Sequence, residues 1–215
     1  MKKFLKLYFK HFWKICELNF IFFFFCVPVF TIGPAIAGIT KVMKNYSQDE
    51  HAFMFIDFWQ SFKNNFLKSL FIGIVDLIVA AILFSAFYVY ISFINSTGNW
   101  IWYIALIITT GIAYTFIMMN FYIFIMIVSV ELKIKDIVKN SFALTVYAIK
   151  ANSLAFFACV LSALVLGTLV YFFPPVGFLL LFFPFTYMSF VINFLLYPYV
   201  DKYIVKPFYE ENTDS

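Results

Sequence analysis

Four polar side chains that stand in apolar stretches of this 215-residue sequence are the ones best placed to do chemistry. Asp76 lies about two helical turns into such a stretch, where a carboxylate is costly unless it is paired or hydrated. Asn120 and Asn193 lie in two further stretches, at a similar depth from the charged ends, and Ser69 shares a helical face with Asp76. We therefore expect these residues to form a polar cluster in the cytoplasmic half of a membrane-embedded bundle.

Two roles for this cluster are open at the level of sequence. Its members could be hydrogen bonds between helices, each worth about 0.6 kcal/mol. They could instead form a site for a solute or a proton. Asp76→Asn is nearly silent under the first interpretation and abolishes function under the second. A structure in which Asp76 faces lipid would contradict both.

No arrangement typical of an enzyme or a metal site stands out. The sequence contains no G-x-x-x-x-G-K-[ST], G-x-S-x-G or H-E-x-x-H string. His11 and His51 lack further ligands of the type and spacing that a metal needs. We therefore predict a non-enzymatic protein with no catalytic residue, no metal and no cofactor.

The composition indicates that lipid is the solvent for much of the surface. Hydrophobic residues make up 64% of the chain and charged residues 12%, whereas a soluble domain has about 25% charged residues. All 15 basic residues are lysine, and they flank apolar runs as membrane anchors do. The expected partner is a lipid bilayer, and nucleic acid is not expected.

The elements that must position the cluster are membrane helices. We predict an all-α polytopic bundle with four full spans in two hairpins, a Pro/Gly-broken N-terminal membrane segment and interfacial amphipathic helices. Uncharged turns at 95–99 and 174–177 close the two hairpins. The four spans are 69–94, 101–130, 152–173 and 178–197.

Amphipathic segments are predicted around these spans. Residues 1–17 carry lysines on one helical face and are expected to lie in the interface plane as a basic helix. Residues 44–68 form an amphipathic connector. Pro198 is expected to stop the last helix, and the tail 201–215 has little to fold around.

The topology depends on residues 18–43, which Pro28, Gly33 and Pro34 interrupt. This segment could cross the membrane once or turn back. A single crossing would leave the four lysines of 41–68 and the four of 131–150 outside. Because lysines concentrate on the cytoplasmic side, we predict a return, with the break packed against the bundle. The chain is then a multi-pass protein of the plasma membrane with a cytoplasmic N-terminus.

Several strings resemble the YesL-like family of small bacterial membrane proteins. They are VPVFTIGPA at 27–35, WQSFKNNF at 59–66 and NFLLYP at 193–198. The family occurs in low-GC Gram-positive bacteria, often encoded beside carbohydrate-uptake systems, and has no established activity. The resemblance implies an accessory or assembly component of carbohydrate uptake, with a sugar permease or a second copy as partner. The alternative is a small-solute transporter or channel with a polar site around Asp76.

Overall fold

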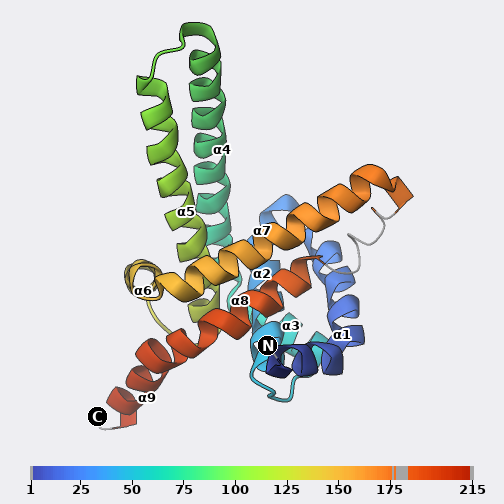
Figure 1. Ribbon diagram of the computed structural model, residues 1–215. Coiled ribbons are helices and arrows are strands. Elements are labelled where there is room, and N and C mark those ends of the chain that lie inside the picture. Colours follow the sequence, from blue (N-terminus) through green and yellow to red (C-terminus); the bar gives the residue numbers. More distant parts are fainter. Residues whose placement is uncertain (1, 176, 178–183, 214–215) are drawn as a thin grey trace.

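The computed structural model describes residues 2–175, 177 and 184–213, and within these residues all regular secondary structure is helical (Figure 1). The prediction of an all-α protein is confirmed. In chain order the helices are α1 (Lys2–Cys26), η1 (Val29–Thr31), α2 (Ile32–Ser47), α3 (Met54–Asn64), α4 (Phe66–Thr97), α5 (Ile101–Ile127), α6 (Ile134–Tyr147), α7 (Ile149–Phe172), α8 (Pro184–Val200), the π-helical turn η3 (Asp201–Val205) and α9 (Lys206–Thr213).

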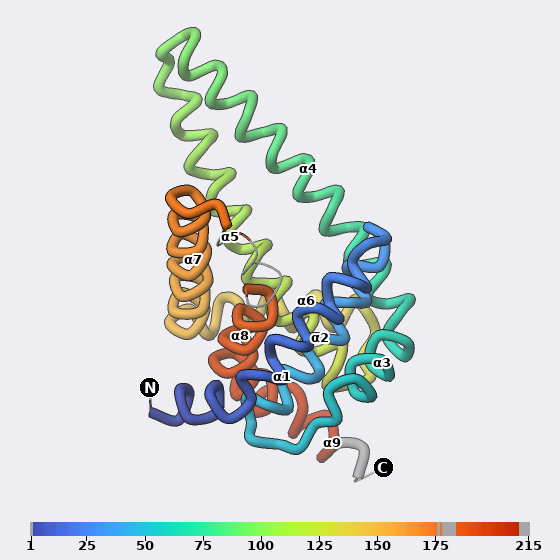
Figure 2. Tube along the Cα trace, turned by 90° about the vertical axis from the view of Figure 1, so that its right-hand side faces the viewer, coloured from blue at the N-terminus to red at the C-terminus, as the bar shows by residue number. Residues whose placement is uncertain are grey.

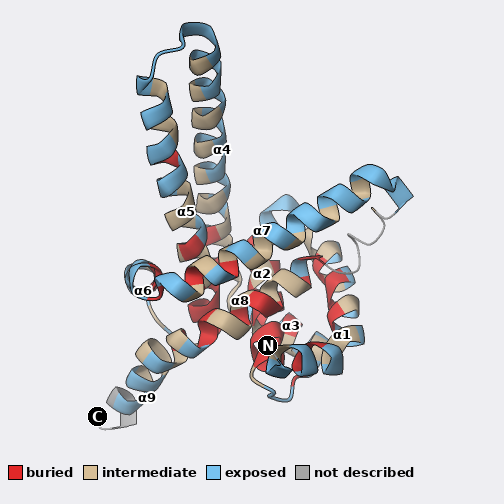
Figure 3. Ribbon diagram, in the orientation of Figure 1, coloured by how far each residue is buried: buried red, intermediate tan, exposed pale blue. Residues whose placement is uncertain are grey.

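Helix α2 is the centre of the fold. It contacts α1, α3, α4, α5 and α8, and nearly all of its residues are buried, as the red core of Figure 3 shows. Small side chains such as Gly33, Ala35, Ala37 and Gly38 let these neighbours approach closely. At Gly38, for example, a Cβ atom would lie 2.7 Å from the ring of Phe58 on α3.

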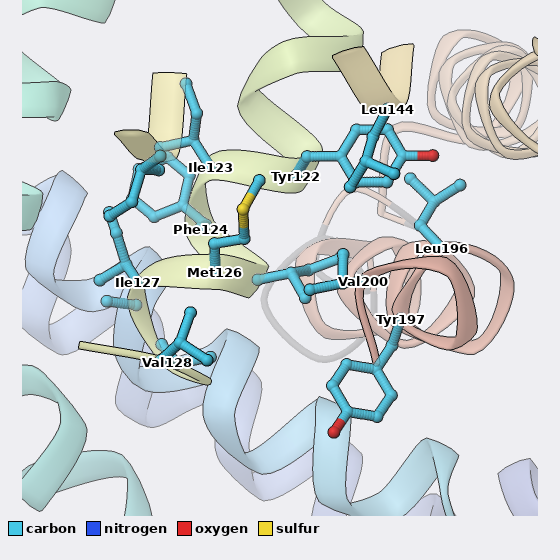
Figure 4. Packing of buried hydrophobic residues seen from close by; sticks show 14 of the residues in the cluster. Tyr122, Ile123, Phe124, Met126, Ile127, Val128, Leu144, Leu196, Tyr197 and Val200 are labelled. Carbon is cyan, nitrogen blue, oxygen red and sulfur yellow. The ribbon is translucent and has the colours of Figure 1, made fainter. Parts of the chain in front are cut away.

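Two clusters of buried apolar side chains hold the helices together. One joins α1, α2 and α3 and includes Phe190 of α8. The other contains buried residues between 122 and 130, from the last turns of α5 and the chain just after it, and adds Leu144 of α6 together with Leu196 and Val200 of α8 (Figure 4). The C-terminal end of α5 is therefore anchored in the protein, while its other end projects away from it (Figure 1).

Within the described residues, three helices are long and apolar enough to cross a membrane: α4, α5 and α7. Few of the residues in their most apolar stretches are buried within the protein (Figure 3), so a bilayer is the environment that their composition indicates. Helices α4 and α5 contact each other and are joined by a short turn. In this turn Gly98, directly after α4, adopts the left-handed conformation (φ 62°) that commonly ends a helix. Helix α7 points in a different direction from this pair (Figure 1).

The predicted fourth span, 178–197, is only partly described, because residues 178–183 lie outside the described residues. Its described part is α8, which comprises Pro184–Val200. This helix packs on α1, α2, α5 and α7. It is more deeply buried than the three membrane-length helices.

The chain beyond Pro198 differs from the prediction. Pro198 lies inside α8, and helical structure continues through η3 to Thr213. The expectation that Pro198 stops the helix is therefore wrong, and residues 201–213, which were expected to have little to fold around, are helical. Pro198 has no backbone N–H, so the helix lacks one hydrogen bond at this position. The loss is tolerated because side chains beyond it pack against the apolar cluster around α5, namely Tyr203, Ile204 and Phe208.

The N-terminal segment also divides differently. A single helix, α1, runs through the expected boundary between 17 and 18, and the chain reverses at 27–31. Helix α2 then returns beside α1 (Figure 2). Gly33 and Pro34 are buried as expected, whereas Pro28 is exposed. Burial of Pro28 is not needed because the hydroxyl of Thr31 donates to the carbonyl oxygens of Phe25 (2.5 Å) and Pro28 (2.6 Å).

Candidate functional site

The structure places Asp76, Asn120 and Asn193 around one pocket of about 400 Å³. The three side chains come from α4, α5 and α8, and α1 and α2 complete the wall. Ser69, the fourth candidate, does not line this pocket. It is fully buried closer to the start of α4, where its hydroxyl donates to the Asn65 carbonyl oxygen at 2.6 Å.

The two asparagine side chains each present an oxygen with no hydrogen-bond donor among the described residues. The amide nitrogen of Asn193 donates to the Ser189 carbonyl oxygen at 2.8 Å, and that of Asn120 to the Phe116 carbonyl oxygen at 3.2 Å. A carbonyl can only accept, so the nitrogen must face it, and this fixes the orientation of each amide. Both Oδ1 atoms are therefore buried acceptors that no described residue satisfies.

Asp76 supplies the third acceptor group of the pocket. Its side chain is half-buried and lies close to the Asn120 amide. Of the described residues that line this pocket, Asp76 is the one that is formally charged. The carboxylate therefore lines the same pocket as the two amides.

The rest of the pocket wall is apolar, with aromatic side chains prominent. It includes Phe22, Ile36, Phe116, Phe121, Phe185 and Met188. Such a wall, with a few convergent polar groups, is typical of small-molecule sites. It suits a ligand with an apolar body and one polar end.

A close crossing of α2 and α4 positions Asp76 on this wall. A Cβ atom added at Gly73, one turn before Asp76, would lie 3.0 Å from the Gly33 Cα atom. A Cβ atom at Gly33 would overlap with the carbonyl oxygen of Ser69. Glycine is thus required at Gly33, and Gly73 is tightly packed against it, at the distance between helices that sets the side of the pocket carrying Asp76.

Sequence reasoning missed a buried hydrogen-bond junction next to this site. The Tyr122 hydroxyl on α5 donates to Oδ1 of Asn152 on α7 at 2.6 Å. Nδ2 of Asn152 donates to the carbonyl oxygens of Thr145 (2.8 Å) and Leu144 (3.4 Å) on α6. Both the oxygen and the nitrogen of this amide are hydrogen-bonded, so Asn152 joins α7 to α5 and to α6. Its sequence signal was a lone asparagine at the start of an apolar run.

Asn19 is a second junction of this kind. Its Oδ1 accepts hydrogen bonds from the backbone N–H (3.2 Å) and the hydroxyl (3.3 Å) of Thr186. The contact ties α1 to the start of α8. The pocket-lining rings of Phe22 and Phe185, whose centroids lie 5.4 Å apart, are thereby held together.

The histidines lie away from the pocket. His11 stacks on Tyr46 with ring centroids 4.2 Å apart, and burial followed by the charges of Lys10 and Lys14 lowers the pKa of His11. The described residues include no group of three or more His, Cys, Asp or Glu side chains arranged to hold a metal ion.

Comparison with known proteins gives one match. The family model described as "Protein of unknown function, DUF624" matches residues 15–87. The matched segment covers the second half of α1, the reversal, α2, α3 and much of α4, so it includes Asp76 but not Asn120 or Asn193. No curated protein and no solved structure matches the chain.

Proposed function

We propose that this chain is a non-enzymatic membrane protein that binds a small solute in the Asp76 pocket, as a transporter or channel does. The observation that carries the proposal is the convergence of Asp76, Asn120 and Asn193 on one pocket with apolar walls. Purely structural amides in a bundle would be expected to pair with neighbouring helices. Here two buried amide oxygens are unpaired among the described residues, which favours an external ligand.

Cysteine reactivity tests whether solutes reach the pocket. Ser189 lines the pocket and Ser85 lies on α4 outside it. In a background in which Cys16, Cys26 and Cys159 are replaced by alanine, Ser189→Cys is expected to react with the small water-soluble thiol reagent MTSEA at least about tenfold faster than Ser85→Cys. Equal, slow reaction of the two variants would indicate a dry, closed core and contradict the proposal.

A second candidate function is the accessory role in carbohydrate uptake. A sugar would bring many hydroxyl groups into the apolar wall of the Asp76 pocket, where they would lose their hydrogen bonds. A link to sugar uptake would therefore act through a permease or a second copy bound to the protein surface. Helix α7 offers a face for this, because nothing lies within 4 Å of a Cβ at Gly167, and Ala163 one turn earlier is also exposed.

Purification from native membranes tests the accessory role. Sugar-permease subunits should co-purify with the wild-type chain and be lost with Gly167→Leu, which blocks close helix contact. Gly111→Leu is the matched control, because it also places leucine where nothing lies within 4 Å of a Cβ. Recovery of no permease subunit with the wild-type chain would contradict this role.

The membrane topology and the relationship are part of the proposal. We infer four spans, with α8 and the preceding residues as the fourth, two hairpins and a cytoplasmic N-terminus in the plasma membrane. Lysine-bearing α3 and α6 lie at the end of the α4–α5 pair opposite its uncharged turn (Figure 1), which supports this orientation. The VPVFTIGPA string lies inside the DUF624 match and supports a YesL-like protein.

A further inference from the structure

The pocket also indicates what kind of solute it binds, an inference that rests on the proposed function. We propose that the solute is an organic ammonium ion with an apolar body. Its N–H groups donate to the Asp76 carboxylate and to the free Oδ1 atoms of Asn120 and Asn193. The apolar body fills the space between the aromatic side chains.

Charge is the first argument. Asp76 lines the pocket, and the described residues that line it include no lysine or histidine. An anion would meet a negative charge without a compensating cation in surroundings where charge interactions are poorly screened. A cation gains this interaction and the attraction of nearby aromatic faces such as Phe116 and Phe121.

The balance of donors and acceptors is the second argument. Asn193 is 1% exposed and its Oδ1 has no partner among the described residues. The Oδ1 atom of Asn120 is likewise buried without a partner among the described residues. A buried acceptor without a donor costs about 1–3 kcal/mol, and the two residues that carry these acceptors line the same pocket as Asp76. A primary ammonium group carries three N–H donors, one for each of these acceptor groups.

The size and polarity of the pocket form the third argument. Its volume of about 400 Å³ lies within the range of small-molecule sites, roughly 300–1,000 Å³. A bare sodium or potassium ion would use the oxygens but leave most of this space as water against Phe22, Phe185 and Met188. An ammonium ion that carries an apolar body uses both parts of the wall.

Binding of a matched ligand set tests the inference. The full-length chain, in nanodiscs of zwitterionic phosphatidylcholine, is titrated with 4-phenylbutylammonium, its N-trimethyl derivative and 4-phenyl-1-butanol by calorimetry. The ammonium ion is expected to bind at least about tenfold more tightly than the other two. If the alcohol binds as tightly as the ammonium ion, the proposal that the solute is a cation is wrong. If the trimethyl derivative binds as tightly, the proposal that its N–H groups donate hydrogen bonds is wrong.

Variants locate the site. Asp76→Asn is expected to weaken ammonium binding about 10- to 100-fold, the loss of one charge-assisted hydrogen bond, and Asn193→Leu to weaken it several-fold. Ser85→Ala, on the same helix outside the pocket, should bind as the wild type does. An unchanged affinity in Asp76→Asn would place the cation elsewhere. The comparison of ligands on the wild type does not depend on the folding of any variant.

The two proposals fail in different ways. If Ser189→Cys reacts rapidly with MTSEA and the alcohol also binds tightly, the proposal of a solute-binding pocket is supported. The proposal that the solute is an ammonium ion is then wrong. Displacement of the ammonium ion by NaCl but not by N-methylglucamine chloride, lost in Asp76→Asn, would identify a metal-cation site and also overturn the inference. Slow reaction of Ser189→Cys without ligand binding would overturn both.

Discussion

The crossing of α2 and α4 predicts that Gly33→Ala is unusually harmful for so small a change. The new methyl group would overlap with the carbonyl oxygen of Ser69, a backbone atom that cannot rotate away. To make room, α4 must move away from α2. Because Asp76 follows Gly73 by one turn on α4, the same movement would open the pocket.

The expected cost follows from two opposing effects. Overpacking a well-packed interior costs about 1–3 kcal/mol, and the rigid backbone contact places Gly33 at the upper end of that range. Replacing glycine by alanine within a helix gains roughly 0.5–1 kcal/mol. We therefore expect Gly33→Ala to be destabilised by about 2 kcal/mol. Gly111→Ala, where no atom lies within 4 Å of the added Cβ, should be unchanged or more stable by up to about 1 kcal/mol.

Thermal unfolding in one detergent, followed by near-UV circular dichroism, measures the difference. For a chain of this size 1 kcal/mol corresponds to roughly 2–4 °C in Tm, so Gly33→Ala should unfold about 4–8 °C below the wild type. Gly111→Ala should unfold at or above the wild-type temperature. If the two variants unfold at the same temperature, the close approach of α2 and α4 is not present.

Two further predictions concern the Asn152 junction and the buried His11. Asn152→Leu should destabilise the protein by about 1–3 kcal/mol because it removes the acceptor of the Tyr122 hydroxyl; in a double-mutant cycle with Tyr122→Phe, additive effects would contradict the hydrogen bond. The pKa of His11 is lowered mainly by burial, so the unfolded chain takes up the proton first, near pH 6.5, and the folded state loses stability as the pH falls below that value. Thermal unfolding between pH 7.5 and 5 should therefore show a steeper loss for the wild type than for His11→Gln, and parallel curves would refute this.

The sequence was informative where local rules dominate. Apolar length predicted α4, α5 and α7, because a run of this kind has few stable alternatives to a membrane helix. Proline and glycine marked the reversal after α1, although the turn lies at Pro28 while Gly33 and Pro34 are already inside α2. The polar residues that line the pocket could be singled out because each is costly in an apolar helix.

Features that depend on packing between distant segments could not be predicted. Helical structure continues past Pro198 because apolar side chains beyond it meet the cluster around α5. The partner of Asn152 depends on how α5 crosses α7, which neither helix encodes alone. Pro28 is exposed because Thr31 satisfies the backbone of the turn, so the turn needs no cover from other helices.

The return of α2 beside α1 is the feature on which the orientation of the pocket depends. Its most direct test is labelling of single cysteines in intact cells with a membrane-impermeant maleimide. Because α2 returns beside α1, the start of α1 and the end of α2 are predicted to lie on the same, cytoplasmic side of the membrane. Thr97→Cys, in the turn after α4, should therefore be labelled from outside, and Gln48→Cys, after α2, should not. Labelling of Gln48→Cys without Thr97→Cys would contradict the account.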